Sequence, residues 1–346
     1  MNSLERHIAT LRGEKIDRIS VSPIVSHQAA VEAGEPMTKV AYNPELMADV
    51  LLRSLNKHGY DSVRPIGDCG LGTECMGSKI LVRDWEQTVV INHGVKSPED
   101  LKKLKVPNPL QDGRMPIFLE CQRILVDSVG DIVEVGGGIT GPLSFAGCLR
   151  GTMELLKDLR TNPEFVHELV RISYEAGKAF GVAQIQNSGV KSINLYEPFA
   201  SLVSNPMADE FSFHYLEQLI CHLKNLGATV LLHICQDSTR LLNRMVEIGA
   251  DILSLDVEVD LGHAKEIVAG RASIQGNVSS MTLATKQPED VYSESCQCIQ
   301  KAGTGGKFIL SSACEVPIDT PPENLDAMLC ASKEFSPKII EEALTN

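Results

Sequence analysis

The stretch TVLLHICQDSTRLLNRMVEIGADILSLD (229–256) decides the fold. Its two ends, TVLLHIC (229–235) and DILSLD (251–256), are short apolar runs typical of strands that are covered on both faces. The segment near 238–249 between them has the pattern of an amphipathic helix. A strand, a helix and a second strand in this order predict two parallel strands joined by a right-handed crossover.

The same unit recurs on both sides of this stretch. Further strands are predicted at DIVEVGGG (131–138), SINLYEP (192–198), ASIQGN (272–277) and KFILSS (307–312). The helices between and after them are expected at 142–159, 162–188, 206–227, near 262–269, near 288–303 and at 322–345. From residue 131 onward this makes six units, and ISVSPIV (19–25) and DSVRPIG (61–67) bring the strands to eight.

Eight strands alternating with helices predict an α/β fold, a TIM (β/α)8 barrel formed by residues 1–346 as a single domain. A doubly wound open sheet has the same alternation, but no GxGxxG motif follows the first strand. The runs KILV (79–82) and TVVIN (88–92) predict a small β-hairpin insertion, at about 68–95, after the second strand.

Composition narrows the function classes. The 346 residues are 43% hydrophobic and 22% charged, as in ordinary globular proteins. The net charge of −13 argues against general nucleic-acid binding, which needs basic surface to neutralise phosphates. No apolar run approaches the ~20 residues needed to span a membrane, and the polar start MNSLERHIATLRGEK is no signal peptide. We therefore expect no membrane association and a cytoplasmic protein with reduced cysteines.

The sharpest chemical feature is His233-Ile234-Cys235 at the end of a predicted strand. Residues two apart in an extended segment point the same way, so an imidazole and a thiolate can converge on one point. This pair alone is weak, since buried cysteines and histidines are common. Cys314, after the last predicted strand, belongs to the same rim of the barrel and would complete a three-ligand zinc site with an open fourth position. Asp256, with nearby Glu258, is the candidate fourth ligand.

Other polar residues are expected near the carboxyl ends of the strands, where barrel enzymes carry their chemistry. Glu134, Glu197, Asp68 and Asn277 are candidates for proton transfer or substrate contact, and each could equally be a structural residue that holds a loop. The segment 136–142, which includes Gly137 and Gly138, is predicted to turn from a strand into a helix. Its N–H groups could hold an anion or shape the substrate floor, or it could simply be a tight turn.

The remaining eight cysteines are assigned to packing. Cys69 is the least certain of them because it should lie near the rim. Cys296 and Cys298 are expected on a helix, where their side chains diverge. Helix faces buried in the core are expected for Cys121, Cys148, Cys221 and Cys330.

Nearly the whole chain resembles the uroporphyrinogen decarboxylase superfamily and, within it, the zinc-dependent corrinoid methyltransferases such as the methylcobamide:coenzyme M methyltransferases. The resemblance rests on SLERHIATLRGEKIDRISVSP (3–23), YDSVRPIGDCGLGTECMGSKI (60–80), GGGITGPLSFAGCLRG (136–151), EPFASLVSNPMADEF (197–211), IQGNVSS (274–280) and CEVPIDTPPENLDAM (314–328). Its most specific element is His233-x-Cys235 with Cys314. It implies that these three residues bind Zn²⁺.

The resemblance also implies the reaction. A methyl group would move between a small substrate, either a thiol or a methyl ether or thioether, and the cobalt of a methylcobamide. No DxHxxG motif of a cobalamin-binding domain is present, so the corrinoid is expected on a separate partner protein. The direction of transfer and self-association as a homodimer are left open.

Two departures from the family patterns matter. Decarboxylases carry an arginine-rich N-terminal motif, but the corresponding segment here, VSPIVSHQAAVEAG (21–34), has no arginine. His27, Gln28 and Cys69 also do not match the coenzyme M enzymes clearly, which leaves the methyl donor and acceptor open. A decarboxylase-type lyase and a non-catalytic partner of a corrinoid protein are the alternatives.

Overall fold

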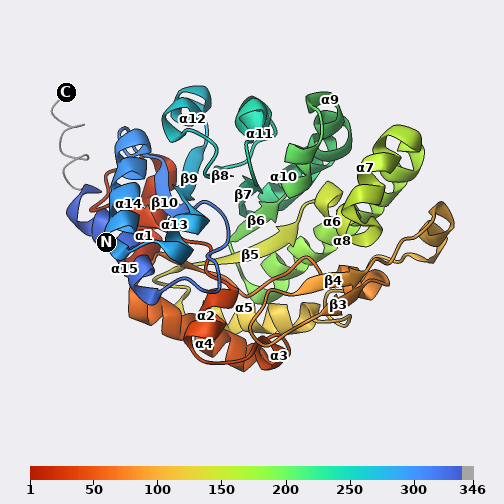
Figure 1. The fold of residues 1–346 in the computed structure, drawn as a ribbon, viewed down its shortest axis with the longest axis horizontal. Helices are drawn as coiled ribbons and strands as arrows, with labels where there is room; N and C mark the ends of the chain where they lie inside the picture. The colour runs from red at the N-terminus through yellow and green to blue at the C-terminus, as the bar shows by residue number, and fades with distance from the viewer. Residues whose placement is uncertain (337–346) are drawn as a thin grey trace.

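The computed structural model describes residues 1–336 and shows a barrel of parallel strands surrounded by helices (Figure 1). The barrel strands are β1 (Ser20–Val21), β2 (Ser62–Val63), β5 (Glu134–Thr140), β6 (Ser192–Tyr196), β7 (Thr229–Ile234), β8 (Ile252–Leu255), β9 (Ser273–Val278) and β10 (Phe308–Ser312). All their pairings are parallel, in the order β1-β10-β9-β8-β7-β6-β5-β2. The predicted TIM barrel is confirmed, and every barrel strand overlaps a predicted one.

The barrel is nearly closed between its first two strands. The Asp61 amide donates to the Val21 carbonyl at 2.7 Å, and the Asp61 side chain accepts from the Val21 amide at the same distance. Arg6 and Arg18 pair with the buried Asp61 carboxylate at 2.8 Å. An ion cluster therefore fastens this seam next to the amino-terminal ends of the strands, opposite to the rim where the predicted ligands lie.

Helices follow the strands around the outside of the barrel (Figure 1). The α-helices are α1 (Ser3–Arg12), α2 (His27–Glu32), α3 (Met37–Val40), α4 (Pro44–His58), α5 (Met115–Val129), α6 (Pro142–Arg150), α7 (Thr152–Thr161), α8 (Pro163–Ser188), α9 (Asn205–Ala208), α10 (His214–Asn225), α11 (Leu242–Glu247), α12 (Leu261–Val268), α13 (Ser280–Thr285), α14 (Pro288–Ala302) and α15 (Pro322–Glu334). Shorter helical turns are η1 (Thr73–Met76), η2 (Pro98–Lys103), η3 (Pro198–Leu202), the π-turn η4 (Asp209–Phe213) and η5 (Thr239–Leu241).

Two predicted helices are divided. The run expected at 142–159 breaks at Gly151, whose φ of +93° ends α6 and starts α7 in a new direction. The run expected at 206–227 consists of α9, the π-turn η4 and α10. The last helix, expected to reach residue 345, ends at Glu334, and residues 337–346 lie outside the described part. No described helix is long and apolar enough to cross a membrane.

The predicted hairpin is present as the antiparallel pair β3 (Lys79–Leu81) and β4 (Val89–Asn92). The inserted segment forms backbone hydrogen bonds on two sides of the carboxyl-terminal rim. On one side Met37 donates its amide to the Asp84 carbonyl at 2.9 Å, and on the other the Val95 amide donates to the Leu149 carbonyl at 2.9 Å. The insertion therefore links the start of α3 to the end of α6.

Candidate metal centre and substrate cavity

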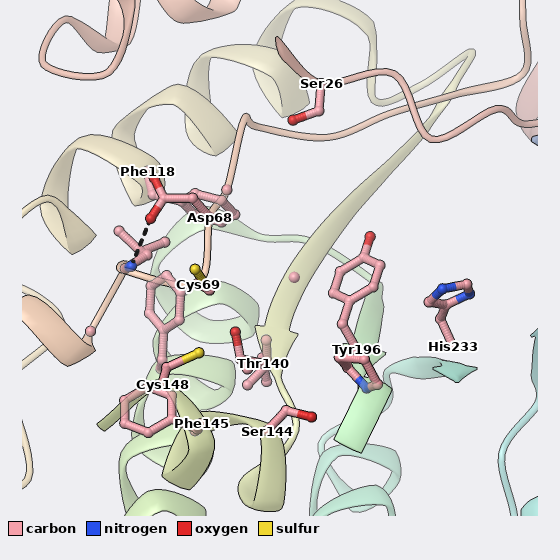
Figure 2. A pocket seen from close by; sticks show the side chains of 18 of the residues that line it. Ser26, Asp68, Cys69, Phe118, Thr140, Ser144, Phe145, Cys148, Tyr196 and His233 are labelled. Atoms are coloured by element: carbon pink, nitrogen blue, oxygen red, sulfur yellow. Dashed lines mark hydrogen bonds between the residues drawn. The ribbon is translucent and has the colours of Figure 1, made fainter. Parts of the chain in front are cut away.

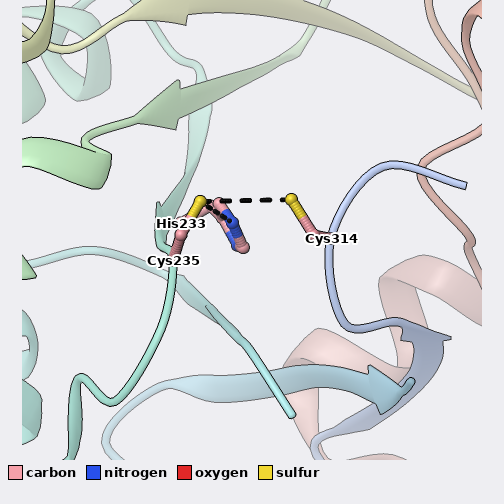
Figure 3. A group of neighbouring side chains, drawn as sticks. All are labelled: His233, Cys235 and Cys314. Atoms are coloured by element: carbon pink, nitrogen blue, oxygen red, sulfur yellow. Dashed lines mark hydrogen bonds between the residues drawn. The ribbon is translucent and has the colours of Figure 1, made fainter. Parts of the chain in front are cut away.

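His233, Cys235 and Cys314 form a group of soft donor atoms at the carboxyl-terminal rim. One ligand atom from each lies within 4.8 Å of the others, and this is the sole such group with metal-ligand character found among residues 1–336. His233 Nε2 lies 3.1 Å from Cys235 Sγ, and the two sulfur atoms are 4.0 Å apart. In Figure 3 Cys235 and His233 come from one side of the group and Cys314 from the other.

The strand geometry explains the convergence. His233 is the next-to-last residue of β7, and Cys235 directly follows that strand, so both side chains face the same side. At Gln236 the backbone adopts a φ of +63°, and its amide donates to Asp256 Oδ2 at 2.7 Å, which fixes the turn after Cys235. Cys314 lies two residues beyond β10, three strands away around the barrel.

The hydrogen bond between Cys235 and Cys314 shifts the pKa values of the two thiols in opposite directions. The hydrogen bond from Cys235, together with His233, lowers the pKa of Cys314 to about 5. The pKa of Cys235 is raised well above its ordinary value because it donates that bond and is buried beside a thiolate. The pairing therefore favours the thiolate form of Cys314, which is the form that a soft cation requires of its ligands.

The donor set fits zinc. With Zn–S bonds of about 2.3 Å, two thiolates of a tetrahedral site lie about 3.8 Å apart, close to the 4.0 Å between these sulfur atoms. His233 Nδ1 lies 3.1 Å from the buried Ser254 hydroxyl, which leaves Nε2 free to face the sulfur atoms. An outer partner of this kind is typical of ligating histidines. Three protein donors leave one position for an exchangeable ligand.

The predicted fourth ligand is not part of this group. Both Asp256 carboxylate oxygens accept backbone hydrogen bonds at 2.7 Å, from Gln236 and Val257, so the side chain organises the two loops beside the site. Glu258 is exposed to solvent. Asp256 takes this role because a carboxylate just after a strand end is within reach of the N–H groups of its own turn.

His233, Cys235 and Cys314, here called the candidate metal-binding group, open into a cavity of about 280 Å³ whose walls are largely aromatic and aliphatic. Its lining includes Arg64, Asp68, Cys69, Leu71, Met115, Phe118, Ile139, Phe145, Cys148, Phe180, Tyr196, Phe199, His233, Cys235 and Cys314. Tyr196 presents its ring edge-on to His233, with centroids 6.1 Å apart. A pocket with apolar walls and a few converging polar groups is the usual form of a small-molecule site.

A second pair of thiols faces the same cavity. Cys69 and Cys148 lie on the side away from His233, with Thr140 and Tyr196 between (Figure 2). Cys148 hydrogen-bonds Cys69, which lowers the pKa of Cys69 and raises that of Cys148. Cys148 is only partly buried, because its helix face meets the cavity wall. The assignment of Cys221 and Cys330 to buried helix faces is wrong, since both are exposed.

Glu197 lies beneath the rim and does not line the cavity. The fully buried carboxylate accepts from the amides of Leu143 at 3.1 Å and Ser144 at 2.8 Å, and from the Ser144 hydroxyl. These are N–H groups of the first turn of α6, which have no partner inside their own helix. Burial raises the pKa of Glu197 to about 7. The residue expected to be catalytic instead fastens the end of β6 to the start of α6.

Two further catalytic candidates also lie off the cavity lining. Glu134 is the first residue of β5, so it lies at the amino-terminal end of its strand, and its buried Oε1 has no hydrogen-bond partner. The Asn277 amide donates to the carbonyls of Asp256 at 2.9 Å and Val259 at 2.8 Å, which holds the loop after β8. Their predicted place near reacting atoms is not supported by this arrangement.

The glycines belong to a strand, as predicted for 131–138, and this strand continues to Thr140 before the chain enters α6. Gly137 and Gly138 lie within β5, where the Gly137 carbonyl accepts from Asn194 at 3.0 Å and the Gly138 amide donates to Gln184 at 2.9 Å. A Cβ atom at Gly137 would come within 2.3 Å of Gln184 Oε1, so close packing explains the glycine. The predicted anion-binding N–H groups are therefore not free, although Gly138 does line the cavity.

Asp68 lines the cavity as expected for a rim residue, but its oxygens are occupied. They pair with Arg114 at 2.7 and 3.0 Å and accept from the amides of Gly70 at 2.8 Å and Leu71 at 3.0 Å. His27 lies beside the Cys314 loop, with its Nδ1 2.8 Å from Glu315. Gln28 bonds Glu32 at 3.3 Å. Asp68 thus shapes the cavity mouth by holding the loop after β2.

Sequence reasoning missed four residues of the site: Arg64, Cys148, Tyr196 and Ser254. Arg64 and Tyr196 stand in or beside predicted strands, and period-two alternation from Ser62 and Asn194 would have pointed both into the barrel. For Cys148 and Ser254 no signal distinguished a cavity or ligand contact from ordinary burial.

Comparisons with known proteins agree with this architecture. Two relatives from Methanosarcina cover nearly the whole chain: the methylcobamide:CoM methyltransferase MtbA of Methanosarcina acetivorans is 29% identical over 96% of this chain and 97% of its own, and the methylated-thiol–coenzyme M methyltransferase of Methanosarcina mazei is 27% identical over 96% and 90%. A uroporphyrinogen decarboxylase of Anaeromyxobacter dehalogenans is 25% identical over 95% and 98%.

A solved structure shares the fold of this chain. A methyltransferase from Methanosarcina mazei superimposes with a TM-score of 0.87 at 27% identity, over 97% of this chain and 99% of that one. The family model of uroporphyrinogen decarboxylase (URO-D) matches residues 2–335. Because this match spans nearly the whole chain, the protein belongs to the uroporphyrinogen decarboxylase family.

Proposed function

We propose that the protein is a zinc-dependent methyltransferase that moves a methyl group between a small substrate and the cobalt of a separate corrinoid protein. The observation that carries the proposal is the opening of His233, Cys235 and Cys314 into one apolar cavity. The printed names of the Methanosarcina relatives support the reaction class.

Zinc bound to this group would lower the pKa of a substrate thiol or polarise the leaving sulfur or oxygen of a methyl donor. The chain's own residues supply the setting. Ser254 orients His233 so that Nε2 faces the thiolates. Phe118, Phe145 and Phe180 line the cavity with apolar surface, which excludes water from a nucleophile that water would otherwise solvate.

The position of the site suits a reaction with a second protein. The metal-binding residues lie at the ends of β7 and β10 on the carboxyl-terminal rim, where a barrel presents its loops to a partner. We propose that the corrinoid is delivered over this rim, and that the substrate occupies the cavity beneath it.

The test is metal content, measured by elemental mass spectrometry on anaerobically purified protein. Wild type should carry about one zinc per chain, Cys235→Ser should carry none, and Cys221→Ser, which removes an exposed cysteine on α10, should match wild type. Turnover is then measured with free methylcobalamin and a panel of thiols and methyl ethers, by the change in the corrinoid absorption spectrum.

Absence of zinc from wild type after reconstitution would overturn the proposed mechanism and favour a metal-free lyase of the decarboxylase type. Zinc without methyl transfer to or from any corrinoid would instead favour a binding partner of a corrinoid protein.

A further inference from the structure

We propose that Cys69 and Cys148 are a redox pair in the wall of the substrate cavity. A small disulfide reacts with Cys69, and Cys148 then displaces the attached thiol to form an intramolecular disulfide. The inference goes beyond the proposed function and does not depend on a metal, because neither cysteine belongs to the candidate metal-binding group. It is carried by the position, the exposure and the hydrogen bonds of the two thiols.

The two cysteines come from different parts of the chain and meet at one wall of the cavity. Cys69 lies in the turn between β2 and η1, and Cys148 lies near the end of α6. Both line the cavity on the side away from His233, and they hydrogen-bond each other (Figure 2). A disulfide bond is about 2.05 Å long, so the sulfur atoms must approach further to form one. Cys69 can make this approach because it lies in a turn rather than in a helix or a strand.

The β-hairpin insertion contacts both cysteines. The Val90 amide of β4 donates a hydrogen bond to the Cys69 sulfur. His93 directly follows β4, and its Nδ1 donates to the Cys148 carbonyl at 2.8 Å. One short segment of the chain therefore holds the turn that carries Cys69 beside the helix that carries Cys148.

The surroundings of the two thiols suit them to different steps. Cys69 is exposed, and the hydrogen bonds from Cys148 and from the Val90 amide lower its pKa. By contrast, burial raises the pKa of Cys75, on the adjacent turn η1, to about 11 and that of Cys298 to about 11. An accessible thiol with a stabilised thiolate and a second thiol beside it is the usual arrangement of a redox-sensitive cysteine and its resolving partner. Cys69 is therefore the thiol that reacts first.

The charges around the pair favour this order. Asp68 precedes Cys69 and opposes its thiolate, but both carboxylate oxygens of Asp68 are bound by Arg114, at 2.7 and 3.0 Å. The pKa of Cys148 is raised by its hydrogen bond to Cys69, by burial and by the charge of Cys69. Modification of Cys69 removes that charge, so Cys148 loses its proton more easily once the first step is complete.

The two steps balance as thiol–disulfide exchange. In the first step the Cys69 thiolate attacks one sulfur of the small disulfide and forms a bond to it, and the other half leaves as a thiolate. In the second step the Cys148 sulfur attacks the Cys69 sulfur, and its proton goes to the departing small thiolate. Two protein thiols are oxidised to a disulfide, and the small disulfide is reduced to two thiols. No other reactant is needed.

The test exposes the protein to bis(2-hydroxyethyl) disulfide, a small neutral probe, under anaerobic conditions. One sample is zinc-loaded wild type. The other is Cys235→Ser/Cys314→Ser, in which the candidate metal-binding group cannot itself form a disulfide. Intact mass spectrometry follows the added hydroxyethylthio group and its later replacement by a loss of two hydrogen atoms. Peptide mapping after alkylation of the remaining thiols identifies the cysteines that have reacted.

The same result is expected in both samples. Cys69 should react about tenfold faster than the exposed Cys221, because hydrogen bonds from Cys148 and the Val90 amide stabilise its thiolate. A bond between Cys69 and Cys148 should follow, and dithiothreitol should reverse it.

Substitutions assign the two roles. In Cys148→Ala the mixed disulfide on Cys69 should form and persist, because no thiol resolves it, and in Cys69→Ala the intramolecular bond should be absent. Cys75→Ala removes a partly buried thiol from the adjacent turn η1 and should behave as wild type. If Cys148→Ala does not fold, the peptide map of the wild-type protein still shows whether the bond joins Cys69 to Cys148.

The outcomes separate this inference from the proposed function. A mixed disulfide that persists on Cys69 in wild type, or a probe that reacts evenly with the exposed cysteines, would overturn the redox pair and leave the methyltransferase intact. Formation of the bond between Cys69 and Cys148 in Cys235→Ser/Cys314→Ser would uphold the pair even if wild type takes up no zinc and the proposed function fails.

Discussion

One cavity carries two groups of cysteines, and the two differ in what surrounds the sulfur atoms. Cys235 and Cys314 share their side of the cavity with His233, whose Nε2 is 3.1 Å from Cys235 Sγ. Cys69 and Cys148 hydrogen-bond each other on the other side (Figure 2). The acid nearest to them in sequence, Asp68, is bound to Arg114.

From this comparison we infer that a pair of thiols alone does not make a metal centre. The first group has a third donor, His233, whose Nε2 faces Cys235 Sγ and whose Nδ1 lies 3.1 Å from the Ser254 hydroxyl that orients it. The second group has no such donor, because the carboxylate beside it is neutralised by a guanidinium. We therefore expect metal to bind at one group and the other to remain a pair of cavity thiols, and four predictions test this difference.

The largest effect is expected from Cys235→Ser and Cys314→Ser. A hydroxyl is a far poorer zinc ligand than a thiolate, so the affinity for zinc should fall on the order of 1,000-fold, beyond the roughly 10- to 100-fold effect of an outer-shell change. Competition with a chromophoric chelator measures it, and methyl transfer should be lost with the metal. Retention of stoichiometric zinc in either variant would show that the ligand set is wrong.

The second prediction concerns Glu197, which links the two groups. Its backbone amide bonds the carbonyl of His233, and its side chain holds the first turn of the helix that carries Cys148. Burial raises its pKa from the ordinary 4.5 to about 7, so the folded state holds this proton more tightly than the unfolded chain. The stabilisation is complete below about pH 4.5 and is lost as pH rises through 7, an effect of ~3 kcal/mol in the free energy of unfolding.

Urea unfolding of the metal-free protein between pH 4.5 and 8 measures this effect. The stability of wild type relative to Glu197→Gln should decline across that window, because the amide does not titrate. Glu164→Gln, an exposed change at the start of α8, should run parallel to wild type. Parallel curves for Glu197→Gln as well would disprove the raised pKa.

The third prediction addresses the outer partner of the metal-binding group. Ser254→Ala removes the hydroxyl 3.1 Å from His233 Nδ1, so the imidazole loses the contact that sets its orientation and tautomer. We expect zinc affinity to fall about 10-fold, and Ser254→Thr, which keeps a hydroxyl, to restore most of it. An unchanged affinity in Ser254→Ala would mean that packing alone orients the ring.

The contrast also shows what the sequence could and could not predict. The alternation of buried strands and helices gives the barrel, and the barrel brings Cys314 to the rim that holds His233 and Cys235 although about 80 residues separate them in the chain. Period-two patterning predicts which side of a strand a side chain faces, but not how far along the barrel axis the residue lies. Membership of a predicted strand places Glu134 among the rim candidates, but β5 begins at this residue, so it lies at the amino-terminal end of the barrel.

Contacts with other helices and strands explain where else the structure differs from the sequence predictions. The Gly138 amide donates to Gln184 and the Gly137 carbonyl accepts from Asn194, so backbone groups that the sequence leaves open to an anion are used within the barrel. Cys148 follows the helical pattern of a buried face, but that face meets a cavity and not the core. Burial by a cavity wall and burial by the core leave the same pattern in a sequence, and only the packed structure separates them.

The smallest effect is expected from the second group of cysteines. Cys69→Ala and Cys148→Ala should leave zinc affinity within about twofold of wild type, since neither sulfur belongs to the metal-binding group. Their own chemistry should change instead. Cys148 lowers the pKa of Cys69 by hydrogen bonding, so Cys148→Ala should slow alkylation of Cys69 by iodoacetamide about threefold at pH 7.5. Peptide mapping of the zinc-loaded protein follows the reaction, with Cys221 as an internal reference of unaltered surroundings. Loss of zinc from Cys69→Ala would show that both sides of the cavity contribute to the metal, and the distinction between the two groups would then fail.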